Sequence, residues 1–324
     1  MKVEGNFSHD QTWGIVGYIQ PSLDALSTED SSSVLMNGIG WLLEPSIRQK
    51  YKDYERRCLL ALWSPCEFLG QVGNFYFDSF SFFTEVYCVC PFTCKFMNEY
   101  FNEEKFKYIP YPFTNYSLEE FGDYDTTCCW FGGIHGQDHI NAIETISQRP
   151  YKFITSGKNR LLHHDFYNTK VTHFGLSTAE KLIEVSRCKS SLTFNKLYLN
   201  PSSAFNSTHG KLRNEAFSHF NRKIMPQFKV RTNEIATCKS LILAYKDPWN
   251  LIDDFYTEGE DFIYFEDFKQ LEEILEDVEN NFDNYKNIIN NAYEKVKNYS
   301  VESILEYIKN DDPNLITWSL KNVQ

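Results

Sequence analysis

At 324 residues the chain is longer than most single domains, and its 42% hydrophobic and 23% charged residues are typical of a folded globular protein. Its formal net charge of −12 argues against nucleic acid and anionic membranes as partners, because both attract clustered Lys and Arg. The N-terminus shows no apolar signal segment, the 9 Cys are an odd number, and no apolar run reaches membrane-spanning length. We therefore expect a two-domain cytoplasmic protein without a transmembrane segment.

The N-terminal part of the chain predicts an α/β domain. Short apolar runs indicate strands at 13–19, 38–44, 59–63 and 86–90, and helical spacing indicates helices at 46–57 and 92–102. The cysteines Cys88, Cys90 and Cys94 lack the spacing of a zinc site, so we interpret them as a buried strand that runs into a helix. Pro110 and Pro112 then place the linker near 110–122.

The C-terminal part alternates strand and helix more regularly. The predicted strands are 126–133, 151–155, 191–195, 240–245 and 262–265, and the predicted helices are 137–147, 177–187, 231–238 and 249–256. After the last strand, Asp267 is the expected N-cap of a helix with Gln270 as its capping-box partner, and Asp283 is the expected cap of the next helix. This alternation predicts a parallel sheet covered on both faces.

The expected architecture is two Rossmann-like α/β domains that face each other across a cleft. We place the first at 1–118 and the second at 119–299; a helical tail follows at 300–324, for which a return to the first domain is one option. In such folds ligands bind at the carboxyl ends of the strands, so we expect the site there.

A glycine-rich turn follows the strand at 126–133. Gly132, Gly133 and Gly136 would let the backbone approach a ligand closely, and the next helix would point its N-terminal amides at an anion. The turn does not match the dinucleotide pattern G-x-G-x-x-G. An ordinary strand-to-helix turn explains it equally well.

Arg231 and Glu234 lie one turn apart on a predicted helix. A Glu at this place can accept both hydroxyls of a ribose, and the Arg could hold a diphosphate or orient that Glu. The alternative is a surface ion pair between the two residues. Further along, Asp247 before Pro248 is a natural N-cap, and Trp249 and Asn250 either contact a ligand or only belong to the capped helix.

The stretch 226–275 resembles the C-terminal core of the Glyco_trans_1-type glycosyltransferases, in the spore-maturation-protein-like branch found in bacteria and large viruses. The shared pattern is Arg-x-x-Glu, a strand, a loop, and then a G-x-D-x-I-x-F strand, which here are Arg231 with Glu234, 240–245, 246–250 and 259–265. The segment 124–146 is similar to the start of that group's C-terminal domain. The segments 38–51 and 77–93 resemble its N-terminal domain more loosely.

The resemblance implies a GT-B fold and an enzyme that moves a sugar from a nucleotide-sugar donor, UDP- or GDP-linked, to a glycan or other hydroxyl acceptor. It implies no metal and no other cofactor. Glu234 would take the donor's ribose, and the amides near Gly132 and Gly133 would take the diphosphate. Relatives that retain the anomeric configuration often carry a second Glu eight positions before the ribose Glu; Pro226 stands there, so inverting or retaining chemistry stays open. The predicted donor-binding residues are Gly132, Gly133, Asp138, Arg231, Glu234, Asp247, Trp249 and Asn250.

The catalytic group is harder to choose. Glu44, at the end of the strand predicted at 38–44, could act as general base on the acceptor, or it could merely bind backbone before Pro45. His135 is the other predicted catalytic residue, with His139 as a rival. A histidine beside a glycine-rich turn more often donates to phosphate.

Two other functions compete with this one. A metal-dependent GT-A transferase would use Asp123 and Asp125 as a D-x-D motif. A non-catalytic nucleotide- or sugar-binding subunit would keep Glu234 and lack a working base. A serine or cysteine hydrolase is disfavoured because no G-x-S-x-G motif occurs. A metal cluster of His163, His164 and His173 is disfavoured because these residues lack metal-site spacing.

Overall fold

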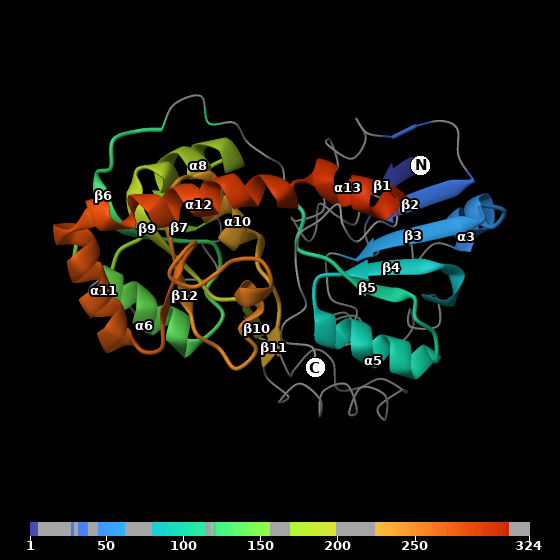
Figure 1. The fold of residues 1–324 in the computed structure, drawn as a ribbon, viewed down its shortest axis with the longest axis horizontal. Helices are drawn as coiled ribbons and strands as arrows, with labels where there is room; N and C mark the ends of the chain where they lie inside the picture. The colour runs from blue at the N-terminus through green and yellow to red at the C-terminus, as the bar shows by residue number, and fades with distance from the viewer. Residues whose placement is uncertain are drawn as a thin grey trace. The chain divides into compact units, whose positions relative to one another are not determined.

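A computed structural model describes residues 1–5, 27–28, 32–37, 45–61, 80–113, 118, 121–155, 169–198 and 224–310. The chain forms two compact units (Figure 1). Unit 1 consists of Met1–Thr114, Leu197–Phe228 and Tyr299–Gln324, and unit 2 consists of Asn115–Lys196 and Lys229–Asn298. The domain limits expected from the sequence, at residues 118 and 299, remain predictions. Within the described ranges, no helix combines the length and apolar character that crossing a bilayer requires.

Unit 1 contains a parallel five-stranded sheet whose strands follow one another in chain order. The strands are β1 (Lys2–Gly5), β2 (Ser33–Asn37), β3 (Arg56–Ala61), β4 (Glu85–Cys88) and β5 (Phe106–Tyr108). Helices α3 (Pro45–Tyr51), α5 (Pro91–Phe101) and α13 (Val301–Asn310) belong to the same unit. A separate two-stranded pairing joins β10 (Lys196–Tyr198) to β11 (Ile224–Pro226).

The sequence predictions for unit 1 are partly confirmed. The strands at β3 and β4 and the helix α5 are confirmed, and Cys88, Cys90 and Cys94 are buried at the junction of β4 and α5. The helix predicted at 46–57 is wrong beyond Tyr51, because Arg56 and Arg57 already pair with β2 as the start of β3. The strands β1, β2 and β5 were not predicted. The strand predicted at 13–19 and that at 38–44, with Glu44, lie outside the described residues.

The last described helix, α13, packs in unit 1 through one apolar face, with Val301, Ile304, Leu305 and Ile308 all buried. A half-buried polar cluster holds its end. Arg56 Nη1 donates to the Lys309 carbonyl at 3.2 Å, and its Nε and Nη2 each donate to the Glu85 carboxylate at 2.7 Å. Tyr87 also donates to Glu85. Residues more than 250 positions apart in sequence are thereby tied together.

We expect the Glu85→Gln variant to lose about 2 kcal/mol of stability at neutral pH and almost none near pH 2. Burial raises the pKa of Glu85, but the hydrogen bonds from Arg56 and Tyr87 outweigh it and lower the pKa to about 2. A carboxylate with a lowered pKa stabilises the fold above its unfolded value, and this contribution fades as the pH falls toward 2. Thermal denaturation of both proteins from pH 6 to pH 3 measures it. A melting-temperature difference that stays constant over this range would contradict the prediction.

Unit 2 contains a parallel six-stranded sheet in the order β13-β12-β9-β6-β7-β8. The strands are β6 (Thr126–Phe131), β7 (Tyr151–Thr155), β8 (His173–Phe174), β9 (Cys188–Thr193), β12 (Leu241–Tyr245) and β13 (Ile263–Phe265). Numbered within the unit, this is the doubly wound order 3-2-1-4-5-6 of a Rossmann fold. The chain runs outward from β6 in one direction and then, from β9, in the other, which makes β6 and β9 the topological switch point.

Helices cover both faces of this sheet (Figure 1). Helices α6 (Gln137–Ile146) and α11 (Phe268–Asn280) pack against each other, while α10 (Val230–Thr237) packs against both α8 (Thr178–Ser186) and α12 (Lys286–Val296). The core between α6, α11 and the sheet is apolar and contains Trp130, Ile143, Phe153, Leu243 and Leu275. The predicted parallel α/β architecture with helices on both faces is confirmed.

Helix starts in unit 2 differ in three places from the prediction. Asp267 caps α11 as expected, but Gln270 accepts from the Glu266 N–H instead of closing a reciprocal box. Asp283 lies inside a 3₁₀ segment, Phe282–Tyr285, and pairs with Lys286, so it is not a cap. The helix predicted at 249–256 is only a 3₁₀ turn, Leu251–Asp254.

Candidate functional site

The candidate site lies at the carboxyl ends of β6 and β9, where the order of the strands reverses. Ligands of open α/β sheets bind outside the carboxyl ends of the strands at such a point. The turn Gly132–Gly136 follows β6, and Phe194–Lys196 follow β9. The site is therefore assembled from these two segments and the helices that begin beside them, α6 and α10.

Gly132 begins the turn after β6 in a conformation that favours glycine. Its φ is +104°, and its N–H donates to the Ile154 carbonyl at 2.9 Å. A Cβ at this position would lie 2.2 Å from Nη2 of Arg231. Gly132 is thus required both by its backbone angle and by the close approach of the guanidinium. The turn ends at Gly136, the N-cap of α6, which offers no side chain to cap the first amides of that helix.

His139, on the first turn of α6, is hydrogen-bonded to this turn. It is 4% exposed, and its Nδ1 accepts the backbone N–H of His135 at 3.2 Å. Burial, followed by the nearby charges of Arg231 and other cations, lowers the pKa of His139 to about 2, so the ring is neutral at physiological pH. Its ring packs against those of Trp130 and Phe194, which also contact each other. His135 itself is exposed, and its catalytic role stays a prediction.

Arg231, on the first turn of α10, lies with its guanidinium carbon 4.7 Å from the ring centroid of Trp130 and 5.2 Å from that of Phe131. Burial lowers its pKa to about 10, partly offset by Glu234, so it stays charged at neutral pH. Among the described residues no carboxylate lies within ion-pair distance of it. A largely desolvated cation without a counter-ion is costly. The arrangement therefore suits an anionic ligand.

Glu234 does not pair with Arg231, so the surface ion pair considered from the sequence is wrong. Its side chain is 7% exposed, and its Oε1 lies 2.6 Å from Nζ of Lys181, which comes from α8. The helix α10 thus presents a cation and a carboxylate one turn apart, each in a different environment.

A buried polar network positions α10. The N-cap of this helix, Lys229, makes no side-chain cap bond of its own. Instead, Asn195, two residues past the end of β9, accepts the Lys229 N–H at 2.9 Å and the Thr232 hydroxyl at 3.1 Å. Thr232 also bonds Thr193 at 2.9 Å. Asn195, just after the central strand β9, therefore caps the helix that carries Arg231 and Glu234. This role of Asn195 was not predicted from the sequence.

The remaining predicted donor residues are engaged with neighbours. Asp138, on the first turn of α6, forms an ion pair with Lys196, whose Nζ lies 4.2 Å from the ring centroid of Tyr245. Asp247 accepts the backbone N–H groups of Trp249 at 2.9 Å and Asn250 at 3.0 Å.

Asp247 thus caps a tight turn rather than an α-helix, and Asn250 has a positive φ of 47°. Burial raises the pKa of Asp247. Donor contacts by these residues and by Gly133 stay predictions.

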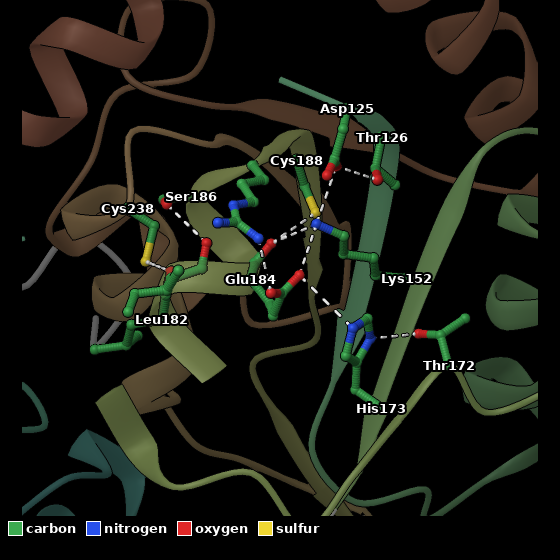
Figure 2. A network of polar contacts seen from close by, with 12 residues as sticks. Asp125, Thr126, Lys152, Thr172, His173, Leu182, Glu184, Ser186, Cys188 and Cys238 are labelled. Carbon is green, nitrogen blue, oxygen red and sulfur yellow. Dashed lines mark hydrogen bonds and ion pairs between the residues drawn. The ribbon is translucent and has the colours of Figure 1, made fainter. Parts of the chain in front are cut away.

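Asp123 and Asp125 lie at the other end of the sheet, just before β6 begins. Figure 2 shows Asp125 in an ion-pair network with Lys152 and Glu184. Lys152 Nζ lies 2.9 Å from both carboxylates, and His173 approaches Glu184 at 3.7 Å. In the described part of the chain, no three His, Cys, Asp or Glu side chains come together as a metal site would require. His163 and His164 lie outside that part.

Known structures with the same arrangement decide the fold. TarM from S. aureus is similar over 94% of this chain and 57% of its own, at 12% identity and a TM-score of 0.56. HepE from Anabaena, solved with UDP-glucose, is similar over 86% of this chain and 78% of its own, at 12% identity and a TM-score of 0.56. The chain has the GT-B fold of glycosyltransferases. The GT-B architecture expected from the sequence is confirmed, and the GT-A alternative is wrong.

Other comparisons agree with the GT-B assignment. Residues 188–310 match the family model described as glycosyl transferase-like, a stretch that includes β9, Arg231 and Glu234. Sucrose-phosphate synthase from Thermosynechococcus elongatus is similar over 86% of this chain and 72% of its own, at 12% identity and a TM-score of 0.52. No match was found among curated protein sequences. The chain spans little more than half the length of TarM.

Proposed function

We propose that this GT-B chain is a glycosyltransferase that transfers a sugar from a UDP- or GDP-linked donor, held by unit 2, to a glycan or other hydroxyl acceptor. The observation that carries the proposal is the guanidinium of Arg231, which forms no ion pair with any described residue, stacks over Trp130 and Phe131 and lies against the Gly132 turn. The presence of UDP-glucose and of UDP in HepE structures favours a uridine donor. Buried thiols such as that of Cys58 suit the reducing cytoplasm we propose as its location.

Each part of the site has a place in this reaction. Arg231 and the first amides of α6 would bind the diphosphate, with Gly132 and Gly133 allowing close approach. Glu234 would accept ribose hydroxyls. Asp138, Asp247, Trp249 and Asn250 complete the proposed donor-binding set.

In the transfer, the acceptor oxygen forms a bond to the anomeric carbon while the bond from that carbon to the diphosphate breaks. The nucleoside diphosphate leaves with the electron pair, and the acceptor proton goes to a base. Arg231 would stabilise the charge that develops on the leaving diphosphate, which needs no metal ion in this scheme. Glu44 and His135 are the proposed candidates for the base, and with Pro226 eight positions before Glu234 the stereochemical outcome stays open.

A thermal-shift screen against UDP, GDP, CMP, dTDP and their sugars, with and without EDTA, tests the proposal. A ligand at 100 times its Kd stabilises the native state by about 2.7 kcal/mol. We expect one nucleotide family to raise the melting temperature with EDTA present, and Glu234→Ala to remove the effect. No shift with any nucleotide, or a shift that requires metal, would overturn the donor site. Binding without transfer or hydrolysis would instead indicate a non-catalytic partner subunit.

A further inference from the structure

Lys181 and Glu234 form an ion pair between two helices at the candidate site. Lys181 lies on the first turns of α8, whose start is fixed by a capping box in which Ser177 and Glu180 bond each other's backbone. Its Nζ lies 2.6 Å from Glu234 Oε1 and 5.5 Å from the ring centroid of Phe131. Lys181 therefore reaches the Glu234 carboxylate from the capped start of α8, and its side chain passes beside Phe131, the last residue of β6.

The pair is one-sided. Lys181 bonds only Oε1, and among the described residues no group donates to Oε2 of Glu234. The carboxylate is 7% exposed and the lysine side chain 22%. A buried carboxylate with one oxygen held by a cation and the other available is an oriented hydrogen-bond acceptor.

We infer that Lys181 is a positioning residue: by holding Oε1 it sets Oε2 of Glu234 to accept the ribose hydroxyls, so the site takes ribonucleoside diphosphates and discriminates against 2′-deoxyribonucleoside diphosphates. This inference rests on the proposed function. A site built to bond a substrate hydroxyl rejects the analogue that lacks it, because its own polar group is left unpaired. We expect discrimination of about tenfold or more, since the acceptor is charged.

A second ion pair in unit 2 provides a matched control. Lys295 Nζ lies 2.6 Å from Asp261 Oδ2, with side-chain exposures of 30% and 7%, close to those of Lys181 and Glu234. This pair joins α12 to the loop before β13 and has no residue of the candidate site in it. Lys295→Met thus removes an equivalent ion pair without touching Glu234.

The experiment measures the Kd of UDP and 2′-deoxy-UDP, and of GDP and 2′-deoxy-GDP, by calorimetry with the full chain. We expect the wild type to prefer the ribonucleotide about tenfold or more. Lys181→Met should bring the ratio close to 1 by weakening the ribonucleotide much more than the 2′-deoxyribonucleotide. Lys181→Arg should restore much of it, and Lys295→Met should leave the ratio unchanged. If Lys181→Met does not fold, Lys181→Gln replaces it, with the same expected fall in the ratio.

A ratio that is unchanged or larger without Lys181 would overturn the inference, as would a wild type that binds both sugars equally. Equal weakening of both nucleotides would show a merely structural ion pair. Absence of any nucleotide binding by the wild type would overturn the proposed function itself. Binding of UDP or GDP with an unaltered ratio in Lys181→Met would overturn only the role of Lys181.

Discussion

Replacing Arg231 with methionine is expected to weaken nucleotide binding about 100-fold and, in the same protein without nucleotide, to raise the melting temperature. Loss of the guanidinium removes a charge-assisted contact to the diphosphate inside a largely desolvated site. Truncating one partner of such a pair costs about 3 kcal/mol, which corresponds to a loss of affinity of about 100-fold. Calorimetric titration with the nucleotide that stabilises the wild type measures this loss.

The gain in stability follows from the same burial. Burial lowers the pKa of Arg231 to about 10, so at every pH below that value the folded protein holds the charged form at a cost the unfolded chain does not have. Methionine keeps an apolar stem against Trp130 and Phe131 and removes the charge. We expect about 1 to 2 kcal/mol of added stability at neutral pH, after allowing for the lost ring contacts.

Arg149 provides the comparison for Arg231. Its Nη1 lies 2.6 Å from the Glu279 carboxylate, and its side chain is 20% exposed. Arg149→Met should therefore lower the melting temperature slightly and leave nucleotide affinity intact. If Arg231→Met instead destabilised the free protein as Arg149→Met does, Arg231 would be a structural cation, and the argument for an anion site would fail.

The parallel sheet of unit 2 could be predicted from the sequence because its strands are buried on both faces. Strands such as β6 and β12 appear as short, nearly continuous apolar runs, and each is followed by a segment with helical period. Unit 1 was predicted less well. In the segment 46–57, Ile47, Tyr51 and Tyr54 have helical spacing. Arg56 and Arg57 nevertheless pair with β2, because tertiary strand pairing outweighs local periodicity.

The candidate site was predictable where its residues are close in sequence. Arg231 and Glu234 are three positions apart, and Gly132 stands directly after a strand, so local pattern was sufficient. The residues that position them were not predictable. Lys181 is 53 positions from Glu234 and Asn195 is 37 from Thr232, and no local spacing indicates such contacts.

The errors at helix starts have a common physical cause. Asp247 before Pro248 has the chemistry of an N-cap, and it does accept two backbone N–H groups, but Asn250 turns into the left-handed region and ends the turn. Asp283 pairs with the exposed Lys286 in place of capping. Side chains that can cap a helix can equally close a turn, so the residue type alone does not set the element that follows.

We expect Gly132→Ala to weaken nucleotide binding about tenfold or more although it removes no charged or polar side chain. The added Cβ would lie 2.2 Å from Nη2 of Arg231, so the guanidinium must move, and the φ of +104° costs the folded protein about 1 kcal/mol or more in addition. Gly259→Ala is the control, since Gly259 also has a positive φ, 77°, with no atom within 4 Å of a Cβ. Gly259→Ala should lower the stability of the protein and leave its nucleotide affinity unchanged.

A double-mutant cycle separates the clash from backbone strain. If Gly132→Ala acts by displacing Arg231, then adding it to Arg231→Met should cost no further nucleotide affinity, because the group it displaces is already absent. If strain in the turn acts by itself, through the amides near Gly133 and α6, the two losses should add. Additive losses would place the diphosphate on the backbone of the turn and leave Arg231 with only a general electrostatic effect. Complete non-additivity would mean that the glycine serves mainly to admit the guanidinium.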